Sequence, residues 1–124
     1  PGLNVDYTGN VAVGKVSTTS KFHVEGPIST AIVIKTGTYT CTNTDSTILG
    51  NAAGGGFTVN LPATSGLTGR QYTIKKIDSS GNAITVDGSG SETIDGAATK
   101  SLGSQYKYVT VQTDGSNWYI IADN

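Results

Sequence analysis

The sequence predicts an all-β protein, and three observations lead to this prediction. Apolar and polar residues alternate along much of the chain, as in "FTVN" at 57–60 and "YVTVQT" at 108–113, which is the spacing of half-buried strands. Ser and Thr make up about a quarter of the 124 residues, and Thr favours strands. Gly, Pro or Asn interrupts each stretch in which apolar residues could follow helical spacing, so we expect almost no helix.

The strand-like segments differ between the two ends of the chain. Those in residues 1–30 are short, and their few apolar side chains cannot offset an ordering entropy of about 1–2 kcal/mol per residue within one chain. From residue 31 to 124 longer strands recur with turn residues between them, which indicates an antiparallel β-sandwich of jelly-roll-like type. We therefore predict an N-terminal neck at 1–30, completed by other chains, and a C-terminal β-sandwich domain at 31–124.

Two hairpins are expected in the sandwich. Residues 70–77 should turn through "DSSGN" into 83–88, and residues 106–113 should turn through Asp114–Asn117 into 118–123. Alternation predicts an inward-facing set of apolar side chains, namely Phe57, Val59, Leu61, Tyr72, Ile74, Val109 and Val111.

The charge balance argues against nucleic acid and membranes as partners. The chain has 8 Lys and Arg against 9 Asp and Glu, a net charge of −1, and so has no basic field for phosphate or anionic lipid. Its longest apolar run, 31–34, is far shorter than the ~20 residues that span a bilayer. We expect no nucleic-acid partner and no membrane insertion.

Cysteine and methionine lead to two further expectations. Cys41 is the only cysteine, which excludes an internal disulfide and a multi-cysteine zinc site, and its place among threonines predicts a buried thiol. The chain has no methionine and begins at Pro1. We therefore expect a processed piece of a longer protein that continues on the N-terminal side.

The titratable residues favour a protein that is not an enzyme. His23 is the only imidazole, and no candidate nucleophile lies near it in the sequence. Asp78, Asp87 and Asp114 each begin a turn rich in Ser, Gly or Asn, where a carboxylate accepts backbone N–H groups. The segment 87–95 has too few acids for a calcium loop. We predict no catalytic residues, no metal and no cofactor.

Exposed aromatic residues are the remaining functional signal. Sugars stack an apolar face on aromatic rings while amides bind their hydroxyls, so Tyr106, Tyr108, Gln112 and Asn117 form a candidate glycan-binding surface. The alternative is that the tyrosines pack in a subunit interface and that Trp118 fills the core.

Two stretches resemble a known class of proteins. "NVAVGKVSTTSKFHVEGPIS" at 10–29 resembles a segment of bacteriophage tail-fibre and tailspike proteins with a Lys-Leu-x-Val-x-Gly pattern, in which Phe22 here replaces Leu. Residues 60–121 resemble the β-rich domains of such virion appendages through "NLPA", "GRQYTIKK", "ETIDG" and "DGSNWY". Together these stretches cover about two thirds of the chain, and neither contains catalytic residues.

The resemblance implies a homotrimeric virion fibre with an intertwined neck and an outward-facing distal part. It implies attachment to a host-cell receptor, for which we expect a glycan, and contact with other virion proteins through the N-terminal side. Alternation places Val11, Val13, Phe22 and Val24 toward the trimer axis and His23 on the opposite face, away from a metal-binding arrangement. Two alternatives stay open: a trimerisation or spacer module whose receptor-binding part lies elsewhere, and a glycan-cleaving tailspike piece.

Overall fold

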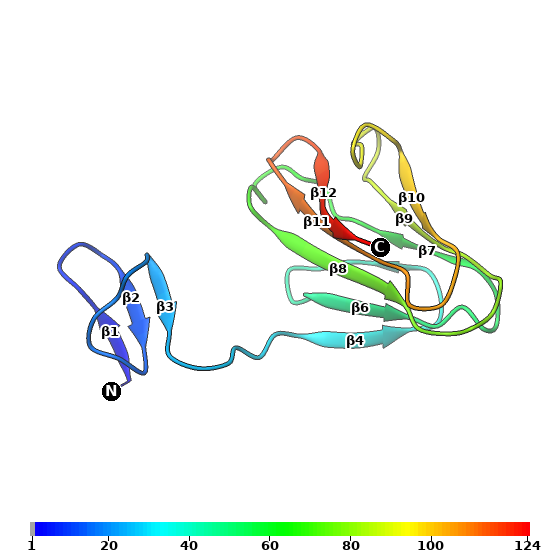
Figure 1. Ribbon diagram of the computed structural model, residues 1–124. Helices are drawn as coiled ribbons and strands as arrows, with labels where there is room; N and C mark the ends of the chain where they lie inside the picture. Colours follow the sequence, from blue (N-terminus) through cyan, green and yellow to red (C-terminus); the bar gives the residue numbers. More distant parts are fainter. Residues whose placement is uncertain (1) are drawn as a thin grey trace. The chain divides into compact units, whose positions relative to one another are not determined.

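The computed structural model describes residues 2–124, and their regular elements are all β-strands (Figure 1). The chain divides into two compact units, one that ends at Thr30 and one that spans Ala31–Asn124. The all-β prediction is confirmed for this part of the chain.

The N-terminal unit is a three-stranded sheet in the order β1 (Leu3–Val5), β2 (Val11–Val13) and β3 (Phe22–Val24). The first two strands form an antiparallel hairpin, and β3 pairs with β2 in parallel. Asp6 shapes the hairpin turn, because its Oδ1 accepts the backbone N–H groups of Thr8 and Asn10, both at 2.9 Å. A short sheet therefore forms locally, and turn chemistry supports it.

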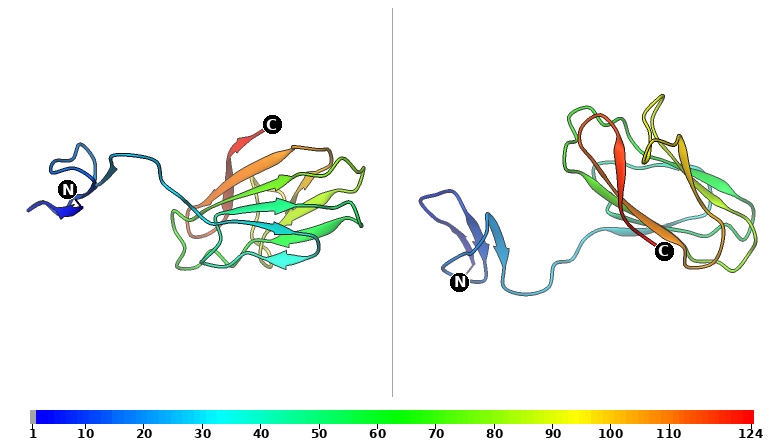
Figure 2. Two further views of the ribbon diagram at one scale, coloured as in Figure 1. Left: turned by 90° about the horizontal axis from the view of Figure 1, so that it is seen from below. Right: turned by 45° about the horizontal axis from the view of Figure 1, so that its top comes forward.

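The C-terminal unit consists of two sheets. The five-stranded sheet has the order β12-β11-β8-β6-β4, and the four-stranded sheet has the order β10-β9-β7-β5. In chain order these strands are β4 (Ile32–Lys35), β5 (Tyr39–Thr40), β6 (Thr47–Gly50), β7 (Phe57–Asn60), β8 (Gln71–Lys76), β9 (Ile84–Asp87), β10 (Thr99–Leu102), β11 (Tyr108–Thr113) and β12 (Trp118–Asp123). Figure 2 shows this unit from two further directions.

The chain of this unit winds between its two sheets. From β4 to β9 each successive strand lies in the other sheet, and β4, β6 and β8 pair in parallel, as do β5, β7 and β9. Antiparallel pairing begins only with β10, β11 and β12. The sheets are thus mixed, and the expectation of antiparallel sheets is wrong for the first six strands of the unit.

The two expected hairpins have different outcomes. The β11–β12 hairpin is confirmed, with Thr113 opposite Trp118. The hairpin between 70–77 and 83–88 is wrong, because β8 and β9 lie in different sheets. Alternation shows that a strand has one buried face, but it does not show with which strand it pairs.

A single core lies between the two sheets. The inward-facing residues predicted from alternation are all buried, and Phe57 is the most exposed of them at 9%. Trp118 is fully buried, with its ring centroid 5.7 Å from that of Tyr72. The larger set of buried core residues is Cys41, Ile48, Ala52, Phe57, Val59, Leu61, Tyr72, Ile74, Ile84, Val86, Ile94, Leu102, Val109, Val111 and Trp118.

Gly50 shows how closely the sheets approach each other. A Cβ atom on this β6 residue would lie 2.2 Å from Cδ1 of Ile84, a residue of the opposite sheet. A side chain at this position would force Ile84 to move, so the glycine fits the dense packing of the core.

Candidate functional surfaces

The N-terminal sheet has one face made entirely of apolar side chains. Cross-strand register places two rows of three residues on this face, one on each side of Ala12. Leu3, Val5 and Phe22 are 73%, 64% and 59% exposed. We call this surface the neck face, and its members are Leu3, Val5, Val11, Val13, Phe22 and Val24.

The opposite face of the same sheet carries Asn4, Ala12 and His23. The chain itself contacts this face, because Asn4 Nδ2 donates to the carbonyl of Lys15 at 2.9 Å and Ala12 is buried. His23 Nε2 lies 3.6 Å from Glu25. The predicted division is therefore confirmed, with Phe22 and Val24 on one face and His23 on the other.

The neck face has no second layer within the chain's N-terminal unit. Among residues 2–30, Ala12 is the only apolar side chain that is buried. Of the six neck-face side chains four are exposed, and Val11 and Val24 are half-buried. Such a sheet gains little from the hydrophobic effect, and an isolated sheet of this size is marginal in water. This surface therefore has the character of an interface with other molecules.

The outer face of the five-stranded sheet is poor in charge. Ile32 and Ile34 of β4 are 62% and 60% exposed, and Leu49 lies beside Ile34 on β6. A row of threonines follows, in which the hydroxyls of Thr73 and Thr110 hydrogen-bond at 2.8 Å. We call the apolar part of this face, Ile32, Ile34 and Leu49, the β4 patch.

The outer face of the four-stranded sheet is different. On its outward positions Thr85 pairs with both Thr58 and Ser101, and Asp87 pairs with Asn60. This face is therefore polar and suited to water. The contrast singles out the five-stranded sheet as the face with interface character.

The four residues proposed for glycan binding do not form one site. Tyr106 and Tyr108 flank Lys75, whose Nζ lies 5.6 and 5.8 Å from their ring centroids. Gln112 lies four residues further along β11 than Tyr108, or about 13 Å. The side-chain oxygen of Asn117 accepts from the backbone N–H of Thr93 at 2.8 Å, so this residue ties two loops together.

Gln112 lies at a hollow on the outer surface of the β11–β12 hairpin. Strand β12 contributes Tyr119 and Ile121, the turn contributes Asp114, and the loop before β8 contributes Thr68. The hollow has a volume of about 230 Å³. Thr68 and Ile121 were not identified from the sequence as site residues, because only the fold brings their segments together.

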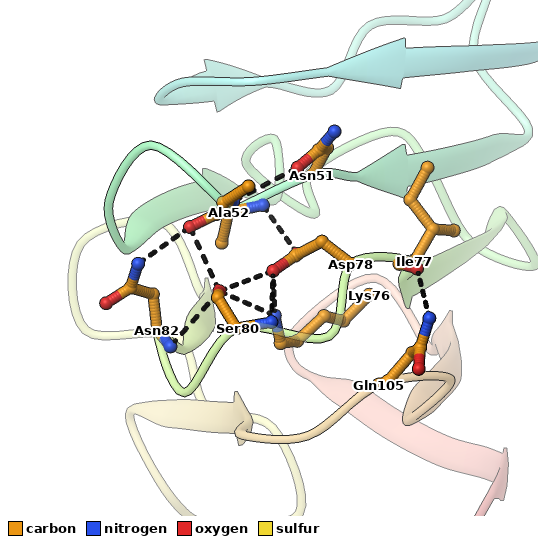
Figure 3. Close-up of polar contacts among 9 residues, drawn as sticks. Asn51, Ala52, Lys76, Ile77, Asp78, Ser80, Asn82 and Gln105 are labelled. Atoms are coloured by element: carbon orange, nitrogen blue, oxygen red, sulfur yellow. Dashed lines mark hydrogen bonds and ion pairs between the residues drawn. The ribbon is translucent and has the colours of Figure 1, made fainter.

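A buried ion pair lies at one end of the core (Figure 3). Lys76 Nζ is fully buried and lies 2.7 Å from Asp78 Oδ2, while Asp78 Oδ1 accepts the N–H of Ala52 at 2.7 Å. The Lys76 ammonium, followed by the Ser80 hydroxyl, holds the pKa of Asp78 well below its usual range. Lys76 was not identified from the sequence, although it follows Tyr72 and Ile74 at period two and so shares their inward face. Its partner could not be predicted from the sequence.

The turn carboxylates behave as structural groups in two of the three predicted cases. Asp78 accepts the N–H of Ser80 at 3.0 Å, and Asp114 accepts those of Ser116 and Asn117 at 2.9 and 3.0 Å. For Asp87, residues 2–124 show no such bond to its side chain.

Cys41 is buried, as predicted. Burial raises its pKa to about 12, so the thiol stays protonated at neutral pH. It therefore lacks the reactivity of a nucleophile.

In the part of the chain that the structure describes, no cluster of three or more His, Cys, Asp or Glu side chains could hold a metal ion. Residues 2–124 also contain no helix of the length and hydropathy that crossing a membrane requires. No protein-family model matches the sequence, and neither does any curated protein.

Proposed function

We propose that this chain is a subunit of a homotrimeric virion fibre of the bacteriophage type. The neck face carries the proposal: it presents six apolar side chains on a sheet that buries only Ala12 among its apolar residues. Such a surface is stable in water when other chains cover it. The resemblance of residues 10–29 to the neck segments of phage fibres supports the same assignment.

A trimer would cover the neck face, which a single chain leaves exposed. Three sheets around a threefold axis can turn all their apolar faces inward, so each copy supplies the layer that the others lack. Closed symmetry also uses one kind of contact for every subunit and leaves no unpaired copy. In this arrangement Val11, Val13, Phe22 and Val24 line the axis, and His23 faces away from it.

The C-terminal unit would be the distal, adhesive part of this fibre. It has its own core, so it can present a fixed outer surface to a receptor on the host cell. Its outward-facing tyrosines and amides are the residue types that bind glycans. The N-terminal side would join other virion proteins.

The test of the trimer is the molecular mass in solution. Sedimentation equilibrium of the full chain over a range of concentrations should give three times the 12.7 kDa mass of one chain. A chain that stays monomeric at concentrations on the order of 100 μM contradicts the proposal, because association of each added chain would then be weaker than about −5.5 kcal/mol.

The test of the adhesive role is binding of the labelled trimer to host cells. If the trimer adheres to intact cells and no longer adheres after their surface glycans are removed, the receptor is a glycan. Adhesion that survives glycan removal and is lost on protease treatment of the cells contradicts the glycan part.

A second function is favoured by the β4 patch. Exposed Ile32 and Ile34 beside Leu49 suit a contact between copies, and the C-terminal unit would then be a spacer or trimerisation module with receptor binding elsewhere. In that case Tyr106→Ala with Tyr108→Ala alters assembly and leaves adhesion of the virion unchanged. An effect on adhesion alone favours the adhesive role.

A further inference from the structure

The hollow at the β11–β12 hairpin has the size of a small ligand site. Its volume of about 230 Å³ lies below the range of about 300–1,000 Å³ that is typical of drug-sized ligands. A ligand of one ring is therefore the largest group that it can enclose. The hollow is open to solvent on the outer surface, where a ring at the end or side of a longer chain could enter.

One wall of the hollow is aromatic and aliphatic. Tyr119 and Ile121 are 46% and 50% exposed, although each has a large apolar surface. Tyr119 lies directly opposite Gln112 across the hairpin, so an aromatic ring and an amide stand side by side. A ring that is apolar on one face and carries hydroxyls at its edge matches this pair.

The polar groups of the hollow are held in place by the protein. Gln112 Nε2 donates to the carbonyl of Gly69 at 3.1 Å, which orients the amide. Asp114 Oδ1 accepts two backbone N–H groups of its turn, and the Tyr119 hydroxyl also interacts with the carboxylate. The N–H groups of Asn117 and then Ser116 lower the pKa of Asp114, so its carboxylate is charged at neutral pH.

The turn that holds Asp114 is rigid. The hydroxyl of Thr113 donates to the carbonyl of Asn117 at 2.8 Å and accepts the N–H of Gly115 at 2.9 Å. Gly115 has a φ of +96°, and a Cβ there would lie 2.6 Å from the Thr68 hydroxyl oxygen. A preorganised turn costs little ordering entropy when a ligand binds.

We propose that this hollow binds one pyranose ring of an uncharged or amino sugar. The ring stacks on Tyr119. Its hydroxyls donate to the Asp114 carboxylate beside or in place of the Tyr119 hydroxyl, and they also hydrogen-bond to the Gln112 amide. Among the residues that the structure describes, Asp114 is the only charged side chain that lines the hollow, so a carboxylate-bearing sugar such as a uronic or sialic acid is repelled. This inference rests on the proposed adhesive function and names the class of glycan that the distal surface recognises.

Saturation-transfer NMR with methyl glycosides tests the site on the full chain. The panel contains methyl glucoside, methyl galactoside, N-acetylglucosamine, glucosamine, glucuronic acid and sialic acid. Single rings typically bind with dissociation constants on the order of 1 mM, so we expect transfer to at least one uncharged or amino sugar. No transfer to any of these overturns the proposal, as does a preference for the two acidic sugars.

Two variants locate the binding. Tyr119→Ala should weaken binding at least tenfold, and Gln112→Ala should weaken it less. Tyr7→Ala is the matched control, because this tyrosine is fully exposed in the N-terminal unit and does not line the hollow. Binding that survives in Tyr119→Ala, or that is lost equally in Tyr7→Ala, overturns the assignment of this site.

The mass of the same sample separates this inference from the proposed fibre. A trimer that binds no sugar overturns the pyranose site and leaves the trimer. A monomer that binds sugar in a Tyr119-dependent way supports the site and overturns the trimeric fibre.

Discussion

The two units of this protein are made of the same kind of strand but differ in what covers it. Strands in both units alternate apolar and polar side chains, as in β1 and β3 of the N-terminal unit and β7 of the C-terminal unit. In the C-terminal unit the apolar faces of two sheets meet, and fifteen buried residues form one core. In the N-terminal unit the apolar face of the single sheet is left exposed. Alternation gives a strand one apolar face, but that face is buried only where a second layer of structure packs against it.

The largest expected effect lies in the core of the C-terminal unit. Ile74→Ala on β8 removes a fully buried side chain between the two sheets, which should cost about 2–5 kcal/mol of unfolding free energy. Urea unfolding followed by circular dichroism measures it. Thr85→Ala, on the polar outer face of the other sheet, is the control and should stay within about 0.5 kcal/mol of wild type. An Ile74→Ala protein as stable as the control would contradict the shared core.

The buried ion pair should make the stability of the C-terminal unit depend on pH. The pKa of Asp78 is lower in the folded protein than the value of about 3.9 in an unfolded chain. Its contribution is therefore fully present above about pH 4 and is lost as the pH falls toward the lower folded pKa. Thermal unfolding of Asp78→Asn at pH 7 and pH 3 should show a lower melting temperature at pH 7 and a smaller drop between the two.

A double variant provides the control for this pair. Lys76→Met together with Asp78→Asn removes the unpaired ammonium as well, so it should recover much of the stability that Asp78→Asn alone loses. If the double variant is less stable than Asp78→Asn, the hydrogen bonds of Lys76 matter more than its charge.

A substitution in the neck face should weaken the association of chains and leave the stability of the C-terminal core unchanged. Phe22→Ser removes an exposed apolar side chain, which changes little in a monomer but removes a buried contact in a trimer. We expect the concentration of half-dissociation to rise at least tenfold, or about 1.4 kcal/mol. Sedimentation of the variant measures this change.

Tyr7→Ser is the matched control for the neck face. Tyr7 is a fully exposed aromatic residue in the β1–β2 turn, outside that face. Equal effects of the two substitutions on assembly would show that exposure alone, and not the apolar face, drives association.

The smallest effect is expected at the β4 patch. Ile32→Thr with Ile34→Thr keeps β-branched residues in the strand, so the unfolding free energy should change by less than about 1 kcal/mol. If this patch contacts another copy, the variant also dissociates a few-fold more readily in sedimentation. No change in association would restrict the contact between copies to the neck.

Much of the fold and part of the candidate surfaces could be predicted from local pattern. Alternation identified the buried positions from Phe57 to Val111, the hairpin at Asp114–Asn117 and the opposite facing of Phe22 and His23. It failed for the pairing of β8 with β9, because pairing depends on segments distant in sequence. The sequence also suggested one site for Tyr108 and Asn117, although Tyr108 begins β11 and Asn117 lies in the turn beyond the other end of that strand.

The sequence by itself therefore determined which residues form strands and which face of each strand is apolar, because both follow from side-chain chemistry at a period of two. Only the tertiary structure decided that the chain winds between two sheets with parallel neighbours, that Lys76 meets Asp78 in the core, and that Thr68 joins Tyr119 at one hollow. These contacts join residues from separate elements, and their formation depends on how whole sheets pack. The neck face depends on both. Its apolar pattern can be recognised in the sequence, but only the folded chain shows that this face is exposed.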